Sequence, residues 1–124
     1  MAKARGRYVD GFVLTIPKKN LAAYRRIAVI AGKVWREHGA LDYKECVGDD
    51  LDTPCGIPFP RVTKLKRGET VVFSYIVYKS RAHRDRVNAK VMDDPRIKNM
   101  LSPDDMPFDM NRMSHGGFKV LVDA

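Results

Sequence analysis

The sequence predicts an α+β fold of the ferredoxin-like type, with elements in the order β-α-β-β-α-β and an antiparallel sheet in the strand order 4-1-3-2. Strand-like and helix-like segments alternate in that order along the chain. The most apolar strand-like segments, 8–16 and 69–78, come first and third, which places them at the centre of such a sheet. With 124 residues, the chain is predicted to form a single domain spanning residues 1–124.

The first half of the chain predicts a strand, a helix and a second strand. Residues 8–16 are rich in β-branched and aromatic side chains and are followed by a proline, as expected for a strand. Asn20 is a suitable helix N-cap, and Gly39 is suited to end the helix in a left-handed backbone conformation. Between them, apolar residues recur at helical spacing and predict one broad apolar face. The alternation in residues 40–47 predicts a half-exposed edge strand.

A long connection, residues 48–68, opens the second half of the chain. It contains three prolines and shows little periodicity, and connections of this length are usually functional, interfacial or mobile. Residues 69–78 then predict a strand that is apolar on both faces. Ser80 is a suitable N-cap for a second helix, which is expected to end near Met92.

The last part of the chain predicts a short helical turn and a final strand. Ser102 is a suitable cap for the turn, with Pro103 in its first position. Residues 112–122 predict the strand. The pair Gly116-Gly117 lies inside this strand and predicts either a bulge or the close approach of another group.

The predicted sheet needs a cover on its second face. Two helices can cover one face only, whereas residues 69–78 and 112–122 carry apolar side chains on both faces. A face that is so apolar is rarely left in contact with water. Because a two-fold pair buries both copies of the face at once, the sequence predicts a homodimer.

Positive charge is concentrated in particular parts of the sequence. The net charge is +8, which favours anionic ligands or acidic partners. Basic side chains gather in the segments 64–67 and 79–90, which are either solvated surfaces or binding sites for RNA or a protein. Nucleic-acid binding lacks support from a motif, because neither an aromatic RNA-recognition motif, a GXXG loop nor a zinc-finger spacing accompanies them.

Other classes of protein are disfavoured by what the sequence lacks. No apolar run approaches the roughly 18 residues of a membrane span, and no apolar signal core precedes the first predicted strand. We therefore expect a cytoplasmic protein with no membrane contact, in which the thiols of Cys46 and Cys55 are reduced. Because these two cysteines do not have a CxxC spacing, they are weak evidence for a metal or redox site. Histidines lie in distant segments whose spacing does not require a metal, and no cofactor motif is present.

Asp10 and His115 are the candidate catalytic residues. Asp10 lies in the middle of a predicted central strand, where burial would suit a carboxylate to general-base chemistry. The ordinary alternative is an ion pair with a neighbour such as Arg7 or Arg112. His115 lies in the fourth predicted strand, which is next to the first, so it can approach Asp10 and form a pair that moves protons.

Aromatic side chains predict a space between the helices and the sheet, although such residues are filled core more often than ligand pocket. The predicted pocket lining consists of Tyr24, Trp35, Tyr43, Phe73 and Tyr75. The second predicted helix carries side chains that either hold a carboxylate or phosphate or form a solvated helix face. These candidate anion-binding residues are Arg81, Arg84, Arg86 and Asn88.

Five stretches cover nearly the whole chain: YVDGFV at Tyr8–Val13, ECVGDD at Glu45–Asp50, ETVVFSYIVYKSRAHRDRVNAKVM at Glu69–Met92, MPFD at Met106–Asp109 and GGFKVLVD at Gly116–Asp123. They resemble the YbaA-like family of small bacterial proteins, and the long central block is the most specific of them. The resemblance implies a ferredoxin-like fold that assembles as a dimeric α/β barrel. The family's function is unknown, so the resemblance supplies no catalytic residues.

The predicted function is therefore a homodimer that binds a small organic molecule between sheet and helices, with a cofactor-independent enzyme as its more specific form. The enzyme form is an analogy from other proteins of this barrel class. The alternative is an RNA- or protein-binding module that uses the basic segments 64–67 and 79–90. A third possibility is a structural interaction protein that uses the loop 48–68 as a contact arm.

Overall fold

The computed structural model describes residues 6–100 and 102–124, and its main elements follow the predicted order β-α-β-β-α-β. These elements are β1 (Tyr8–Pro17), α1 (Leu21–Glu37), β2 (Asp42–Val47), β3 (Glu69–Tyr78), α3 (Arg81–Asp93) and β4 (Ser114–Lys119). Short helices lie between them, namely η1 (Lys18–Asn20), α2 (Phe59–Val62), α4 (Pro95–Lys98), η2 (Pro103–Asp105) and η3 (Met110–Arg112). The α+β class is confirmed.

The strands form one four-stranded antiparallel sheet in the order β2-β3-β1-β4. This is the predicted order 4-1-3-2 counted from the opposite edge. The central strands β1 and β3 pair over their whole length, from Tyr8 opposite Tyr78 to Pro17 opposite Glu69. Their apolar sequences predicted this position, because a central strand has a neighbour on both sides and exposes little of its backbone to water.

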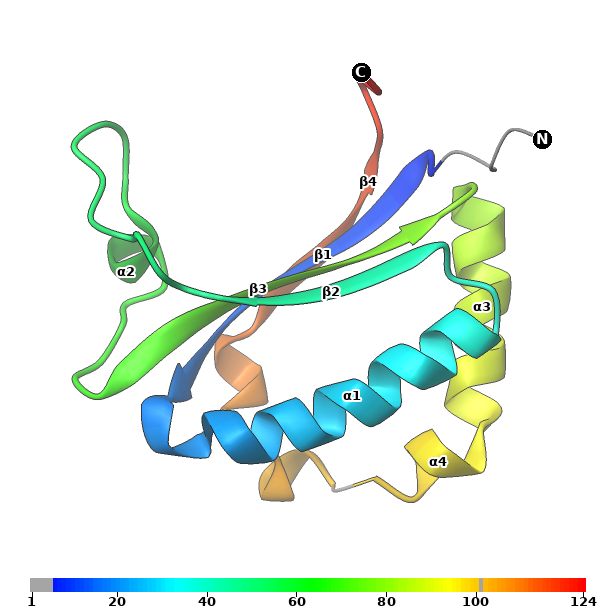
Figure 1. Ribbon diagram of the computed structural model, residues 1–124, viewed down its shortest axis with the longest axis horizontal. Helices are drawn as coiled ribbons and strands as arrows, with labels where there is room; N and C mark the ends of the chain where they lie inside the picture. Colours follow the sequence, from blue (N-terminus) through cyan, green and yellow to red (C-terminus); the bar gives the residue numbers. More distant parts are fainter. Residues whose placement is uncertain (1–5, 101) are drawn as a thin grey trace.

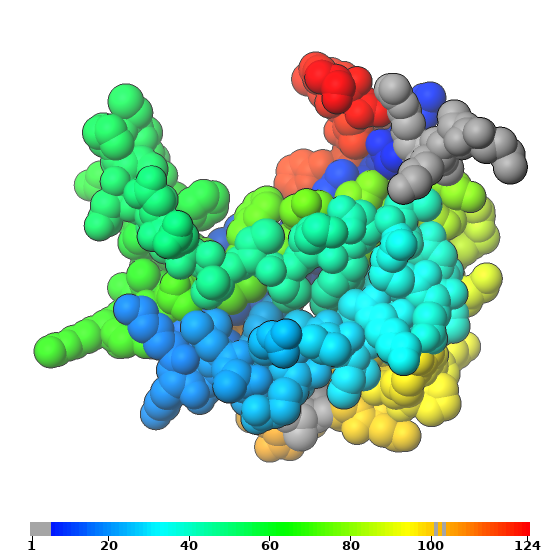
Figure 2. All heavy atoms as spheres, in the orientation of Figure 1, coloured from blue at the N-terminus to red at the C-terminus, as the bar shows by residue number. Residues whose placement is uncertain are grey.

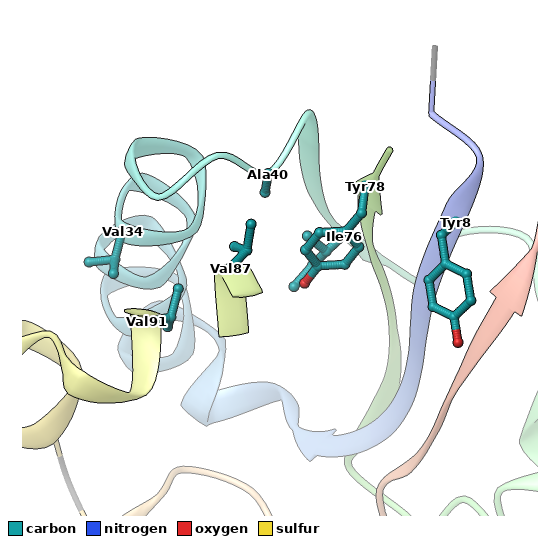
Figure 3. Packing of buried hydrophobic residues seen from close by; sticks show 7 residues of the cluster. All are labelled: Tyr8, Val34, Ala40, Ile76, Tyr78, Val87 and Val91. Atoms are coloured by element: carbon teal, nitrogen blue, oxygen red, sulfur yellow. The ribbon is translucent and has the colours of Figure 1, made fainter. Parts of the chain in front are cut away.

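The helices α1 and α3 cover one face of the sheet (Figure 1). Because successive side chains of a strand point to opposite faces, the even-numbered residues of β1 and β3 point toward the helices. One buried cluster joins Ile76 and Tyr78 of β3 to Val34 of α1 and to Val87 and Val91 of α3 (Figure 3). A second buried cluster, toward the other end of β1, consists of Leu14, Ile16, Val72 and Phe108.

Two of the four predicted helix-end signals are confirmed, and Ser102 makes no capping hydrogen bond at η2. Ser80 Oγ accepts a hydrogen bond from the His83 backbone N–H at 3.0 Å and caps α3. Gly39 follows the end of α1 with a φ of +117°, a conformation that suits glycine. The predicted capping by Asn20 is wrong, because its side-chain Nδ2 donates instead to the Pro107 carbonyl oxygen at 2.9 Å. Asn20 thus joins the start of α1 to the segment that precedes β4.

The glycine pair of β4 permits the close approach of the Tyr8 side chain and makes no bulge. Gly116 and Gly117 pair with Gly11 and Asp10 in an unbroken register. A Cβ atom on Gly117 would meet the hydroxyl group of Tyr8, so a larger residue would displace that ring. The strand is shorter than the predicted range 112–122, since it ends at Lys119.

Residues 48–68 form an arm that extends away from the body of the molecule, on the side of the sheet opposite α1 (Figures 1 and 2). Its short helix α2 contacts β3. At this end of the sheet Thr15 and Val71 are buried, although they lie on the face that the helices do not cover. Farther along the same face Phe73 and Phe118 remain 44% and 62% exposed. Much of this apolar face is therefore uncovered in a single chain.

A buried hydroxyl group on this face leads to a first prediction. Thr15 Oγ1 is buried and has no hydrogen-bond partner among the described residues, so folding removes its water without replacement. Thr15→Val, which puts a methyl group in its place, is expected to raise the free energy of unfolding by about 1 kcal/mol, measured by urea denaturation. Thr63→Val is the control, because Thr63 Oγ1 donates to the Phe59 carbonyl oxygen at 2.7 Å and should gain nothing. A less stable Thr15→Val protein would contradict the prediction.

Candidate functional site

A cavity of about 520 Å³ lies between the sheet and the helix layer. Its lining includes Ile76 from one buried cluster and Leu14 and Phe108 from the other. The apolar core is therefore divided, and the cavity occupies the space between its two parts. A cavity of this size, lined mainly by apolar side chains with a few polar groups, has the properties of a small-molecule site.

The structure places three of the five predicted lining residues at this cavity. Tyr24, Trp35 and Tyr43 line it. Phe73 and Tyr75 do not line it, so the prediction is wrong for these two residues. Their neighbours Ser74 and Ile76 line the cavity, so the alternation of β3 directs Phe73 and Tyr75 to the opposite, uncovered face. The prediction failed because it considered aromatic character without the strand's alternation.

Methionines form another part of the wall, which the sequence analysis missed. Five of the chain's six methionines line the cavity, namely Met92, Met100, Met106, Met110 and Met113. The clustering of these residues between positions 92 and 113 was the signal in the sequence. Methionine side chains are flexible and polarizable, so a wall made of them adapts to ligands of different shapes.

Asp10 is buried at the cavity and forms an ion pair. Arg84 Nη1 of α3 donates a hydrogen bond to Asp10 Oδ1 at 2.7 Å, and the guanidinium carbon lies 5.1 Å from the centre of the Tyr8 ring. The sequence suggested Arg7 or Arg112 as the partner of Asp10. That suggestion is wrong for Arg112, which instead forms an ion pair with Glu69 at 2.7 Å.

His115 also lines the cavity but is exposed. Its ring stacks on that of Phe12, with 5.9 Å between ring centres. In the β1–β4 register His115 lies opposite Phe12, whereas Asp10 lies opposite Gly117. The two candidate catalytic residues therefore share one cavity, and Arg84 rather than His115 contacts the Asp10 carboxylate.

The four predicted anion-binding residues of α3 do not form one site. Arg84 and Asn88, one turn apart, both line the cavity, whereas Arg81 and Arg86 are exposed outside it. Asn88 Oδ1 accepts hydrogen bonds from Trp35 Nε1 and from the Tyr78 hydroxyl group, both at 3.1 Å. Arg84 and Asn88 are thus engaged with neighbouring side chains, and the group predicted to hold an anion is divided between two environments.

A second polar group at the cavity was not predicted. The Tyr24 hydroxyl oxygen lies 2.9 and 2.6 Å from the two carboxylate oxygens of Glu45. Burial raises the pKa of Tyr24, and the nearby Glu45 carboxylate raises it further, so the phenol stays protonated and donates. Burial also raises the pKa of Glu45, while the hydroxyl groups of Tyr24 and Ser74 act in the opposite direction. The alternation of β2, which puts Glu45 on the same face as Tyr43, was the available signal.

The two basic segments lie far apart. Segment 64–67 is at the base of the arm, and segment 79–90 includes most of α3 at the other end of the molecule (Figure 1). The two segments thus lie at opposite ends of β3. This arrangement gives no support to a nucleic-acid site built from both segments together.

Within residues 6–100 and 102–124, no group of three or more His, Cys, Asp or Glu side chains is placed to hold a metal ion. Cys46 and Cys55 are exposed free thiols. In the same part of the chain, no helix combines the length and the apolar character needed to cross a membrane.

The fold and cavity define a small α+β protein with a partly open cavity between its two layers, and comparison with known proteins identifies its family. Residues 7–110 match the family described as "Protein of unknown function (DUF1428)". The chain is 41% identical over 117 residues to "Uncharacterized protein YbaA" of Escherichia coli K12, covering 94% of this chain and 98% of that protein. The same values hold for the protein of that name in Shigella flexneri. The chain belongs to the DUF1428 family, and the YbaA-like resemblance of its motifs is confirmed.

The Asp10–Arg84 ion pair leads to a second prediction. Arg84→Met leaves a buried carboxylate without its cation, so the free energy of unfolding should fall by about 3 kcal/mol in chemical denaturation. The double variant Asp10→Asn/Arg84→Met removes both charges and should recover at least half of that loss. If Arg84→Met alone were as stable as the wild type, the ion pair would not stabilise the packing of α3 on β1.

Proposed function

We propose that this protein binds a small, largely apolar organic molecule in the cavity between its sheet and its helices. The observation that carries the proposal is the cavity itself, about 520 Å³ in volume, which separates two parts of the apolar core. Polar groups reach it at separate places, from the Asp10–Arg84 ion pair and from the Tyr24–Glu45 pair. Apolar walls with a few convergent polar groups are typical of sites that bind and orient organic ligands.

The predicted catalytic residues have different roles in this proposal. Asp10 is held by the Arg84 guanidinium at 2.7 Å and serves as a fixed polar anchor. His115 lies exposed at the cavity, stacked on Phe12, where it can contact a ligand that enters. The more specific form of the proposal, a cofactor-independent enzyme, requires His115 or Glu45 to accept a proton from the bound molecule.

A third prediction tests ligand binding. Native mass spectrometry of gently purified protein is expected to show an added organic mass, which denaturation of the same sample releases. Ala31 lines the cavity from α1, so Ala31→Phe should fill part of it and abolish the added mass. Ala22→Phe is the control, because Ala22 is exposed and does not line the cavity. An Ala31→Phe protein that keeps the full added mass would place the ligand elsewhere.

We also propose that the protein forms a homodimer in which the uncovered faces of two ferredoxin-like sheets pack as a dimeric α/β barrel. The Phe118 ring supports this, because it lies over Gly11, about 3.5 Å from where a Cβ atom of that residue would be, and spreads an exposed aromatic surface across the sheet. The arm 48–68 and the C-terminal residues extend on this same side (Figure 1). Such a face is stabilised when a partner removes it from water.

A fourth prediction tests the dimer. Phe118→Asp should convert a dimer into a folded monomer in light-scattering chromatography, because Phe118 contributes exposed apolar surface and little to the core of one chain. Val29→Asp is the matched control, since Val29 is 57% exposed on α1 and lies away from the uncovered face. The helical signal in circular dichroism should not change in either variant. A monomeric wild-type protein, or a Phe118→Asp protein that remains dimeric, would contradict the proposed interface.

A further inference from the structure

One carboxylate differs from the other partly buried acids of the described chain. Asp10, Asp42, Glu69 and Asp94 each form an ion pair with a lysine or an arginine. Glu45 is half-buried, and no ion pair to it occurs among the described residues. A carboxylate removed from water without a cation is costly. The described side chains therefore provide no cation that pairs with the Glu45 carboxylate.

The groups that do contact Glu45 are hydroxyl groups. Tyr24 lies within hydrogen-bond distance of both carboxylate oxygens, but a phenol has a single proton to donate. Ser74 is the strand neighbour directly opposite Glu45, and its hydroxyl group also stabilises the carboxylate. Since a carboxylate has about four acceptor positions, these two hydroxyl groups leave acceptor capacity for a further donor.

Aromatic side chains lie near Glu45 and can pack against the apolar part of a bound ligand. Glu45, Tyr24 and Tyr43 all line the cavity, and the Trp35 ring lies 6.1 Å from that of Tyr43. Aromatic faces attract organic cations and pack against flat apolar groups. The positive charge of Arg84, which also lines the cavity, is already matched by Asp10.

Basic side chains also lie outside the cavity, along the groove between α1 and β2. Arg25, Lys33 and Arg36 line this groove, as Glu45 does. None of them is within ion-pair distance of Glu45, and Lys44 instead pairs with Asp42. Glu45 thus lines both the cavity and this groove, and no described lysine or arginine forms an ion pair with it.

We infer that Glu45 makes the cavity selective for an organic cation, namely a protonated amine carried on an apolar, flat body. The ammonium group donates to the Glu45 carboxylate beside Tyr24, and the apolar body lies among the aromatic and methionine side chains. This inference rests on the proposed ligand-binding function of the cavity and names the chemical class of its ligand.

A fifth prediction tests this with three probes of the same shape that differ in charge. These are 1-naphthylmethylamine, 1-naphthalenemethanol and 1-naphthoate, titrated by calorimetry into the wild-type protein. The amine should bind at least about tenfold more tightly than the alcohol, because a hydrogen bond between charged groups is stronger than one to a neutral donor. The naphthoate should bind most weakly, since its charge repels that of Glu45.

Two variants complete the experiment. Glu45→Gln keeps the size and an acceptor oxygen but removes the charge, so it should abolish the preference for the amine over the alcohol. Asp50→Asn is the control, because it removes one negative charge from an exposed position of the arm and should leave the ranking intact.

The possible outcomes separate the two proposals. If all three probes bind equally, or if the naphthoate binds best, the cavity is a ligand site but the inference about Glu45 is wrong. If the preference for the amine survives in Glu45→Gln, the cation site lies elsewhere and the inference is also wrong. If none of the probes binds, the proposed function is contradicted, and the inference with it.

Discussion

The ion pair between Asp10 and Arg84 is the contact on which the arrangement of the site depends. A carboxylate buried in a central strand requires a cation, and the 2.7 Å contact with Arg84 fixes α3 against β1. Asn88, one turn farther along α3, then accepts hydrogen bonds from Trp35 of α1 and from Tyr78 of β3. Polar contacts between side chains thereby join β1, β3, α1 and α3 around the cavity.

The cavity contacts both parts of an apolar core that is divided in two. Apolar side chains pack in two separate clusters, one around Tyr78 and one around Phe108. Between the clusters the walls carry aromatic rings, methionines and paired polar groups, and the flexible methionine side chains can adjust to the shape of a ligand. On the sheet face away from the helices, the apolar side chains of Phe73 and Phe118 are exposed, because the chain itself does not cover them.

The sequence predicted the fold better than the site, for physical reasons. Strand alternation, helical spacing and the signals at Ser80 and Gly39 act over a few residues, and they led to the correct sheet order. Side-chain partners are chosen over long distances along the chain, and Asp10 and Arg84 are 74 residues apart. Asn20 also has a distant partner, because its side chain donates to the Pro107 carbonyl oxygen and does not cap α1. The alternation of β2 could have predicted that Glu45 faces the helices, but its hydrogen bond with Tyr24 is seen only in the structure.

The central claim is that the space between sheet and helices is a true apolar cavity and not a region where side chains close on one another. A crystal structure determined under xenon pressure tests this most directly, because xenon occupies apolar cavities without requiring polar partners. We expect xenon density between Trp35, Phe12 and the methionine side chains of the cavity wall, with α1 and α3 in the positions described above. A structure without xenon there, in which the side chains of α1 and the sheet fill the space, would contradict the central claim.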